Sequence, residues 1–293
     1  MMPPLGLRGE LPKRRALLGT SVNKLGRACE ASYFHIGRAE PVYASVVELY
    51  EPINTLKPVG EDLWVVDGPI VRMAYLGVSI PFPTRMVLIR LTNGGLFLWS
   101  PTEPDDGLRA EIDALGPVRH LVSPNKIHYA HIAAWKGIYP EATAWASPGV
   151  RERAASQLID VSFDADLGDG PDSAWREDLD QLVFRGSSFM EEVVFFHRKT
   201  RTLVLADLIE NFEPEKMRGA YRWVVRLAGA AAPDAKTPID LRLTFMGHRK
   251  EARSAFKRMV AWEPEKAIMA HGRPYERDGT AELRRAFRWL GSE

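Results

Sequence analysis

Short apolar segments, some paired across turns and others separated by helical segments, constrain the fold of this chain more than any other feature. Residues 84–101 contain two apolar runs around Asn93-Gly94-Gly95, a turn sequence that tolerates positive φ and predicts a β-hairpin. Residues 105–116 place apolar residues on one helical face, and the apolar segment RHLVSP (119–124) follows as a strand. Strands in hairpins, together with strands that alternate with helices, predict a mixed α/β architecture.

The rest of the chain continues this alternation. An apolar strand at Leu63–Val66 is predicted to end in a turn at Asp67-Gly68-Pro69, and Ser147 is predicted to cap a helix with Pro148 at its first position. Two strand pairs are predicted within residues 182–211, with HRKT as one hairpin connection. The remaining predicted elements are helices around Pro214–Leu227 and Lys250–Trp262, a strand in KAIMAHG, and a last helix over Thr280–Leu290.

Length and composition fit one large globular domain. The chain has 293 residues, of which 45% are hydrophobic and 26% are charged, as in an ordinary folded protein. Residues 1–50 are rich in Arg and Lys without sustained periodicity, so we expect a partly irregular N-terminal extension before a domain over residues 51–293. The formal net charge of +1, without a basic stripe, argues against a nucleic-acid-binding protein.

The cysteine content and the length of the apolar runs limit which disulfides, membrane spans and cellular locations are expected. The single cysteine, Cys29, excludes an internal disulfide framework and a cysteine-rich zinc site. No apolar run reaches the roughly 18 residues of a membrane span. The twin arginine Arg14-Arg15 raises an export signal as an alternative, but Lys24 and Arg27 interrupt the apolar stretch, so a cytoplasmic location is favoured. The sequence is compatible with a homo-oligomer.

Titratable residues follow three predicted strands at their carboxyl ends. RHLVSP leads into His128 and His131, TLVLAD ends on Asp207, and KAIMAH ends on His271. Functional groups in α/β sheets commonly lie at this edge. Imidazole nitrogens and a carboxylate oxygen suit Zn²⁺, Fe²⁺ or Mn²⁺, and three or four such ligands leave a position for water, as in catalytic sites. The alternative reading is an ordinary hydrogen-bonded histidine, which we expect for His35, His120, His197 and His248.

The order of elements and these residues resemble the metallo-β-lactamase-fold superfamily over about Leu56 to Gly291. The resemblance implies an αββα sandwich with two mixed sheets flanked by helices. The first metal-binding motif of the superfamily is His-x-His-x-Asp-His, and the corresponding sequence here is KIHYAH. His128 and His131 match its second and last histidines, whereas Lys126 and Ala130 replace its first histidine and its aspartate.

The resemblance also assigns the remaining ligand positions. Asp207 matches the bridging aspartate, His271 matches the final histidine, and Ser187 replaces the histidine of a Gly-His-Thr-like turn. Of the ligand set of one metal, His128 and Asp207 remain. Of the other set, His131, Asp207 and His271 remain. The resemblance therefore implies one metal rather than two, held by His131, Asp207 and His271, with His128 as a fourth ligand or a group that faces the bound water.

A single-metal hydrolase is the function that this resemblance implies. The metal, zinc in the first place with iron or manganese as alternatives, would lower the pKa of a bound water and polarise an ester, thioester, lactone or phosphoester of an unknown small molecule. Lys126 would stabilise developing negative charge, and Asp207 could act as a base. The alternative is a metal-free, non-catalytic descendant that binds a small molecule or a protein, with Lys126 paired to Asp207. Glu191 and Glu192 are expected to be solvated, and a carboxylate that supports a metal ligand is the alternative reading.

Overall fold

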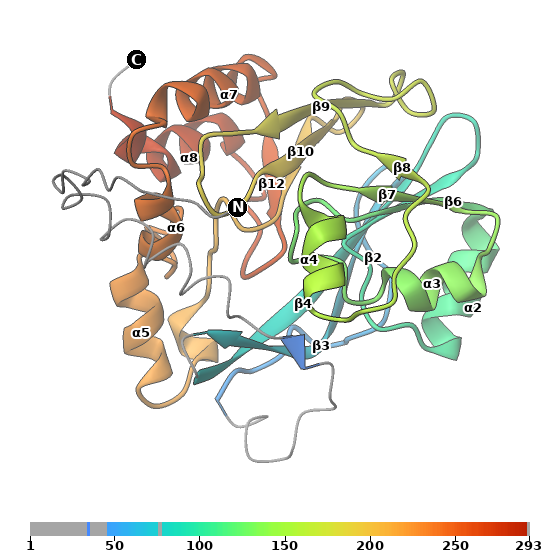
Figure 1. Ribbon diagram of the computed structural model, residues 1–293, viewed down its shortest axis with the longest axis horizontal. Coiled ribbons are helices and arrows are strands. Elements are labelled where there is room, and N and C mark those ends of the chain that lie inside the picture. The colour runs from blue at the N-terminus through green and yellow to red at the C-terminus, as the bar shows by residue number, and fades with distance from the viewer. Residues whose placement is uncertain (1–33, 36–45, 76–77, 292–293) are drawn as a thin grey trace, which may run out of the picture.

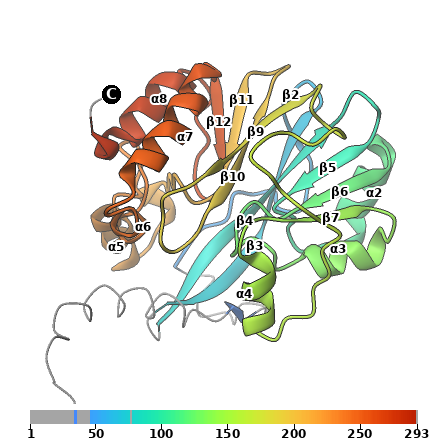
Figure 2. The ribbon, with the colours of Figure 1, turned by 45° about the horizontal axis from the view of Figure 1, so that its top comes forward.

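A computed structural model describes residues 34–35, 46–75 and 78–291 of the chain. The predicted N-terminal extension, residues 1–50, lies mostly outside these ranges, and its character stays a prediction. The described residues form two β-sheets stacked face to face, with helices on both outer faces (Figures 1 and 2). This arrangement confirms the predicted αββα sandwich.

The larger sheet comes from the N-terminal half of the chain. Its strands lie in the order β1-β3-β4-β5-β6-β7-β8, and β2 pairs with β3. The predicted hairpin is present as β4 and β5, with Gly94 at φ +81°, and the strands from β5 to β8 are parallel. The bounds are β1 Phe34–His35, β2 Lys57–Gly60, β3 Leu63–Tyr75, β4 Val78–Arg90, β5 Leu96–Trp99, β6 Val118–Val122, β7 Thr143–Ala146 and β8 Ala165–Asp166.

The smaller sheet has the order β12-β11-β10-β9. Strands β9 (Leu179–Phe184), β10 (Glu192–His197) and β11 (Thr202–Leu205) are antiparallel neighbours, and β12 (Lys266–Met269) runs parallel to β11. Every residue of β10 and β11 is buried, because one face packs against the larger sheet and the other is covered by helices. The apolar runs in these strands reflect this double coverage.

Apolar side chains from both sheets fill the interior of the sandwich. Trp99 and Val122 of the larger sheet share one core cluster with Phe195, Val204 and Ile268 of the smaller sheet. Each large side chain that is fully buried in such a core stabilises the fold by roughly 1.5–3 kcal/mol. The two sheets are thereby held together as one body, which fixes the ends of β6, β11 and β12 relative to one another.

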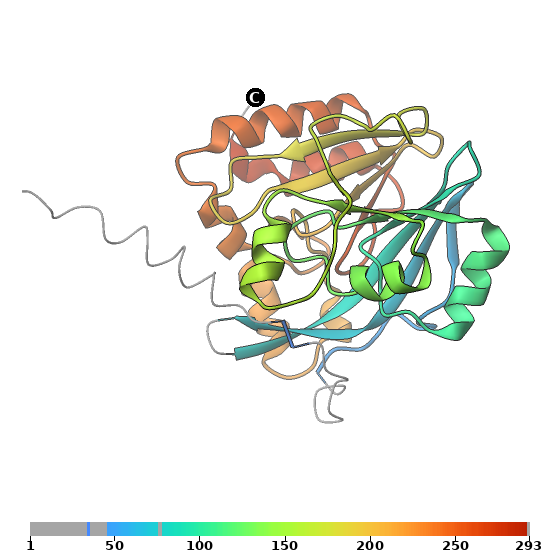
Figure 3. The ribbon, with the colours of Figure 1, turned by 45° about the vertical axis from the view of Figure 1, so that its right-hand side comes forward.

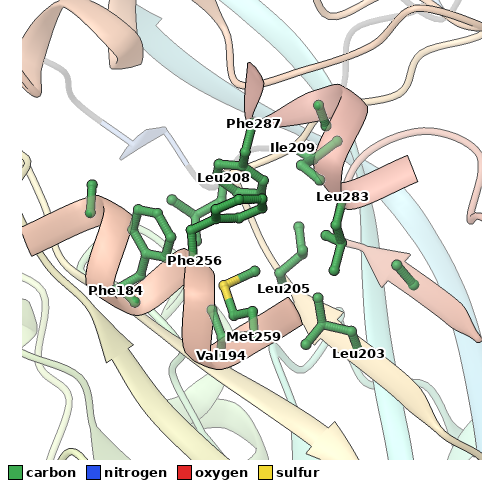
Figure 4. Packing of buried hydrophobic residues seen from close by; sticks show 14 of the residues in the cluster. Phe184, Val194, Leu203, Leu205, Leu208, Ile209, Phe256, Met259, Leu283 and Phe287 are labelled. Carbon is green, nitrogen blue, oxygen red and sulfur yellow. The ribbon is translucent and has the colours of Figure 1, made fainter. Parts of the chain in front are cut away.

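Helices complete the outer layers. Helices α2 (Asp106–Leu115), α3 (Ile132–Ile138) and α4 (Val150–Ser156) pack on the larger sheet, and α7 (Arg249–Ala261) and α8 (Gly279–Ala286) pack on the smaller one (Figure 3). In the second of these layers, Phe256 and Phe287 meet side by side above Met259 and Leu205 (Figure 4). None of the helices in the described part of the chain is long and apolar enough to cross a bilayer.

The predicted turn at Asp67-Gly68-Pro69 is wrong, because β3 continues through it. The pairing of β3 with β4 shifts register between Asp67 and Ile70, so that Gly68 and Pro69 form an irregularity within one long strand. A Cβ atom on Gly68 would lie 2.5 Å from Thr84 Oγ1, and this close approach requires glycine.

Several predicted helix boundaries are also wrong. Helix α4 begins at Val150 after Gly149, which has φ +76°, and not at Pro148 after Ser147. The predicted helix over 214–227 is two elements, and the helix predicted to end at Leu290 breaks after Ala286. The elements not yet bounded are η1 Pro214–Lys216, α5 Tyr221–Ala228, α6 Ile239–Thr244, which the sequence patterns did not predict, and η2 Arg288–Leu290.

Candidate metal centre

Three strand ends bring His128, Asp207 and His271 together. Asp207 and His271 each follow their strand by two residues, and β11 and β12 are parallel neighbours, so the two side chains lie at one edge of the smaller sheet. His128 reaches the same point from the loop after β6 in the larger sheet. One ligand atom from each residue lies within 4.8 Å of the other two.

Both imidazole rings present Nε2 to the carboxylate. His128 Nε2 lies 3.2 Å from Asp207 Oδ2, and His271 Nε2 lies 3.4 Å from Asp207 Oδ1. His271 Nδ1 lies 2.9 Å from the carbonyl oxygen of Pro83, which can only accept a hydrogen bond, so Nδ1 carries a proton. In the neutral ring this leaves a lone pair on Nε2, directed at a carboxylate oxygen that also bears lone pairs. A proton or a metal cation between these atoms would remove the repulsion.

The second histidine is held from the other side of the site. Ser100 Oγ lies 2.8 Å from His128 Nδ1, which fixes the ring with Nε2 toward Asp207. Burial lowers the pKa of His128, but the charges of Asp207 and Glu192 outweigh this and raise the pKa above its ordinary value. Burial raises the pKa of Asp207, but His128 and His271 lower it far more, so the carboxylate is ionised. The electrostatics thus favour positive charge at this point.

A buried polar network fixes the carboxylate. Asn125 Nδ2 donates to Asp207 Oδ2 at 2.7 Å and to Glu192 Oε2 at 3.2 Å. Glu192 in turn accepts from the backbone N–H groups of Ala206 and Asp207, at 2.7 and 2.8 Å. Burial, followed by the charge of Asp207, raises the pKa of Glu192 to about 7. Asp207 is therefore oriented by Asn125 and Glu192, in the way that outer partners orient metal ligands.

The expectation that Glu192 is solvated is wrong. Its residue is 1% exposed, because β10 is an inner strand of the smaller sheet and both faces of that sheet are covered. Asn125, which is fully buried, was not predicted as a site residue at all. Its position directly before the KIHYAH sequence was the one available signal, since its contacts come from residues 67 and 82 positions away.

His131 and Lys126 lie differently from the predicted ligand arrangement. His131 is not in the group of His128, Asp207 and His271; its ring lines the adjoining pocket, and its Nε2 is buried without a hydrogen-bond partner in the described structure. Burial lowers the pKa of His131, although Glu103 opposes this, so the neutral ring is favoured. The Lys126 ammonium lies 4.3 Å from the ring centroid of Phe189.

Ser187, which replaces the turn histidine of the superfamily, serves the local backbone. Its hydroxyl lies 2.7 Å from Thr244 Oγ1 and accepts from the N–H groups of Phe189 and Met190, both at 3.1 Å. These bonds order the loop before β10, which contributes Phe189 and Met190 to the pocket wall. The position has thus become part of the loop scaffold.

A pocket of about 110 Å³ adjoins the three convergent residues. Strands β3 and β4 of the larger sheet, loops at the ends of the smaller sheet and helix α6 contribute to its wall, which also includes Glu210 and Asp240. Burial, followed by the charges of Asp207 and Asp240, raises the pKa of Glu210 well above its ordinary value, which favours the protonated acid. The arrangement therefore combines a cation-binding cluster, a carboxylic acid and an enclosed space for a small molecule.

Comparison with known proteins gives one family match. A family model described as "Domain of unknown function (DUF4336)" matches residues 64–218, which is more than half of the chain. A comparison with curated protein sequences finds no match.

Solved metallo-β-lactamases share the fold. DIM-1 metallo-β-lactamase exposed to ceftazidime is 13% identical, with a TM-score of 0.54 over 84% of this chain and 97% of that one. FIM-1 from Pseudomonas aeruginosa, in its mono-zinc form, is 11% identical, with a TM-score of 0.55 over 80% and 94%. A metallo-β-lactamase from Hirschia baltica is 16% identical, with a TM-score of 0.51 over 82% and 98%. These comparisons confirm the metallo-β-lactamase-type fold.

Proposed function

The chain belongs to the DUF4336 family, a domain of unknown function, and we propose that this member is a metal-dependent hydrolase with one divalent ion held by His128, Asp207 and His271. One observation carries the proposal. His271 donates from Nδ1 to the carbonyl oxygen of Pro83 and turns Nε2 toward an ionised Asp207, an arrangement that is complete only with a cation or a proton between the two. Zinc is the first candidate, with iron or manganese as alternatives, because the donors are two imidazoles and one carboxylate.

The residues around the cluster support hydrolysis. A divalent ion supplies positive charge that lowers the pKa of water and polarises a carbonyl or phosphoryl oxygen. Asn125 and Glu192 keep Asp207 oriented, and the neutral ring of His131 offers a hydrogen-bonding nitrogen in the wall of the pocket. Glu210, held toward its protonated form in the pocket wall, would donate a proton to the departing oxygen. Lys126 stays a predicted stabiliser of negative charge.

A metal-free binding protein is the second candidate. It is favoured by the replacement of three superfamily ligand positions by Lys126, Ala130 and Ser187. A proton shared between Asp207 and the two histidines could complete the cluster without an ion. The pocket would then bind a small molecule or a protein segment without catalysing a reaction.

Metal content of protein purified without chelators separates the two candidates. We expect about one equivalent of zinc, iron or manganese per chain. Asp207→Ala should lose it, whereas Asp240→Ala, which removes a carboxylate from the wall of the same pocket, should retain it. Hydrolysis of generic esters and phosphoesters by the loaded protein, absent in Asp207→Ala, is the second expected result. A protein without metal, which also fails to bind added zinc, would overturn the hydrolase proposal.

A further inference from the structure

The wall of the pocket next to the metal centre is largely apolar. Strands β3 and β4 contribute Val71, Met73 and Phe82, and the loops before α3 and β10 contribute Ile127, Phe189 and Met190. Such a wall favours a ligand part that carries no charge, because burial of an unpaired charge against apolar groups is costly.

The cationic group in this wall has no capacity left for an anionic ligand. Arg85 is 3% exposed, and its Nε and Nη2 donate to Asp67 Oδ1 at 2.9 and 2.7 Å. Its Nη1 donates to the carbonyl oxygens of Met269 and Gly272. The other titratable groups that line the pocket, apart from three histidines, are the carboxyl groups of Asp207, Glu210 and Asp240. Apart from the histidines, no cationic side chain among the described lining residues therefore remains to pair with a second carboxylate.

A buried nitrogen in the same wall points to a ligand. His131 is 7% exposed, and its Nε2 has no hydrogen-bond partner among the described residues. A buried polar atom without a partner destabilises the protein, so a bound polar group that pairs with it is favoured. A neutral imidazole pairs well with an uncharged hydrogen-bonding group.

From these three observations we propose that, among carboxylic esters, thioesters and lactones, the site takes those whose acyl group is apolar and uncharged, and that acyl groups with a second carboxylate are excluded. This inference rests on the proposed hydrolytic function. In the reaction, the oxygen of water bonds to the carbonyl carbon and the bond from that carbon to the leaving oxygen or sulfur breaks. One proton of water moves to the leaving atom, and the acid is the other product.

Two matched probes of the same acyl length test the inference. Pentanamide and glutaramate differ in that the second ends in a carboxylate, and neither needs turnover to bind. We expect metal-free protein, titrated by NMR chemical shift, to bind pentanamide at least about tenfold more tightly. For loaded protein we expect kcat/KM for p-nitrophenyl pentanoate to exceed that for the mono-p-nitrophenyl ester of glutaric acid by a similar factor.

A variant with an added cation sharpens the test. Val71→Lys, in the pocket wall, should reduce or reverse the preference, whereas Leu158→Lys, on a side chain that is 94% exposed elsewhere, should leave it unchanged. Equal or tighter binding of glutaramate by the unmodified protein, or no binding of either probe, overturns the inference. If the preference is found but the protein holds no metal, the inferred ligand class stands and the hydrolase proposal fails. If the protein holds metal and hydrolyses esters without this preference, the hydrolase proposal stands and the inferred ligand class fails.

A second inference comes from the surface formed by α5 and α6. Of seven large apolar side chains that are exposed in the described residues, all but Leu158 lie in this region: Trp223, Val224, Leu227, Ile239, Leu243 and Met246, here called the α5–α6 patch. Leu227 is 80% exposed and Met246 is 65% exposed. Both helices lie along one edge of the molecule, with α6 above α5 in Figure 1, and close to each other in Figure 2.

Charge around the patch is strongly basic. Residues 217–250 contain seven Lys or Arg and two Asp, whereas the whole chain has a net charge of only +1. The guanidinium groups of Arg222 and Arg226 lie 5.9 and 5.3 Å from the Trp223 ring centroid. A short helix with exposed Trp, Val and Leu beside arginines is typical of segments that lie on an anionic lipid surface.

The geometry points to the α5–α6 patch as a docking surface for an anionic bilayer. In sedimentation with vesicles, we expect binding to phosphatidylcholine mixed with phosphatidylglycerol, at least about tenfold weaker binding to phosphatidylcholine alone, and loss of binding at high salt. Trp223→Ser with Leu227→Ser should abolish it, and Leu158→Ser should not. No binding to the anionic vesicles overturns the inference. A dimer of the unmodified chain that the double variant loses also overturns it, because the patch then joins two copies.

Discussion

Two buried histidine clusters in this molecule differ in one component. In the first, His120 of β6 accepts a hydrogen bond from Trp145 Nε1 at 3.2 Å and lies against the edge of the Trp175 ring. In the second, His128 lies eight residues later along the chain, with its Nε2 beside the carboxylate of Asp207. Both rings are removed from water, but only the second has an ionised partner.

The electrostatic consequence of this difference is large. Burial lowers the pKa of His120 to about 4, and the more distant charge of Asp172 does not restore it. The pKa of His128 is raised although burial acts on it in the same direction as on His120. Burial alone thus produces a neutral structural histidine, whereas burial beside a carboxylate at a strand end produces a cation-binding group. Asp207 is the residue that separates the two clusters.

Removal of Asp207 should therefore have the largest effect. Asp207→Asn removes the anionic donor of the cluster, and we expect zinc affinity to fall by more than about 1,000-fold. His120→Gln should leave zinc affinity unchanged, because that ring lies in the other cluster. Isothermal titration of both variants with zinc measures the difference, and equal affinities would contradict the comparison.

The pH dependence of stability should distinguish the first cluster. The pKa of His120 is about 4 in the folded state, below its ordinary value of 6.5, so the unfolded chain binds more protons between these pH values. Stability should fall as the pH is lowered through this window, by about 3 kcal/mol in total from this residue. Urea unfolding at pH 7 and pH 4 should show a weaker pH dependence in His120→Gln. An unchanged dependence would show that folding does not lower the pKa of His120.

Two buried amides allow a matched test of the surrounding groups. Asn125 orients Asp207, and Gln181 accepts from Trp175 Nε1 in the first cluster. Both Asn125→Ala and Gln181→Ala should destabilise the fold by about 1–3 kcal/mol in denaturant, because each leaves buried polar groups without partners. Only Asn125→Ala should also weaken zinc binding, by about 10–100-fold. Weaker zinc binding in Gln181→Ala would show that the two clusters are coupled.

The smallest effect is expected at Ser100. Its hydroxyl lies 2.8 Å from His128 Nδ1 and orients a ring that Asp207 already constrains. Ser100→Ala should lower zinc affinity only several-fold, which corresponds to the roughly 1 kcal/mol of one hydrogen bond. Thr102→Ala, on the same loop, is the control. A loss of zinc affinity as large as that of Asp207→Asn would show that Ser100, and not Asp207, makes the dominant contact that orients the His128 ring.

The sequence predicted what depends on local patterns. Hydrophobic periodicity and turn residues predicted the β4–β5 hairpin and helix α2. In the structure, the N-cap residue of α2, Asp105, accepts a hydrogen bond from Leu108 N at 2.9 Å. Because His128, His131, Asp207 and His271 all follow predicted strands, they were expected to lie at one edge, and the structure brings His128, Asp207 and His271 together. The hairpin and the helix are set by residues within a few positions of one another, which a single sequence displays directly.

The features that the sequence did not predict depend on contacts between distant residues. Glu192 was expected in solvent because the residues next to it in the sequence do not indicate that a second sheet and helices cover β10. The role of Asn125 depends on Asp207, 82 positions away, and the continuity of β3 through Gly68-Pro69 depends on its pairing with β4. His131 matched a motif position, yet its ring lies in the pocket wall outside the three-residue cluster.

Anomalous diffraction at the zinc edge, from crystals of zinc-loaded protein, tests the central claim most directly. We expect one ion at roughly 2.0–2.2 Å from Nε2 of His128, Nε2 of His271 and one carboxylate oxygen of Asp207. We also expect His131 to lie outside the coordination shell. An ion that binds His131 in place of His128, or a cluster that stays without zinc at saturating concentration, would contradict the assignment of His128, Asp207 and His271 as the metal ligands.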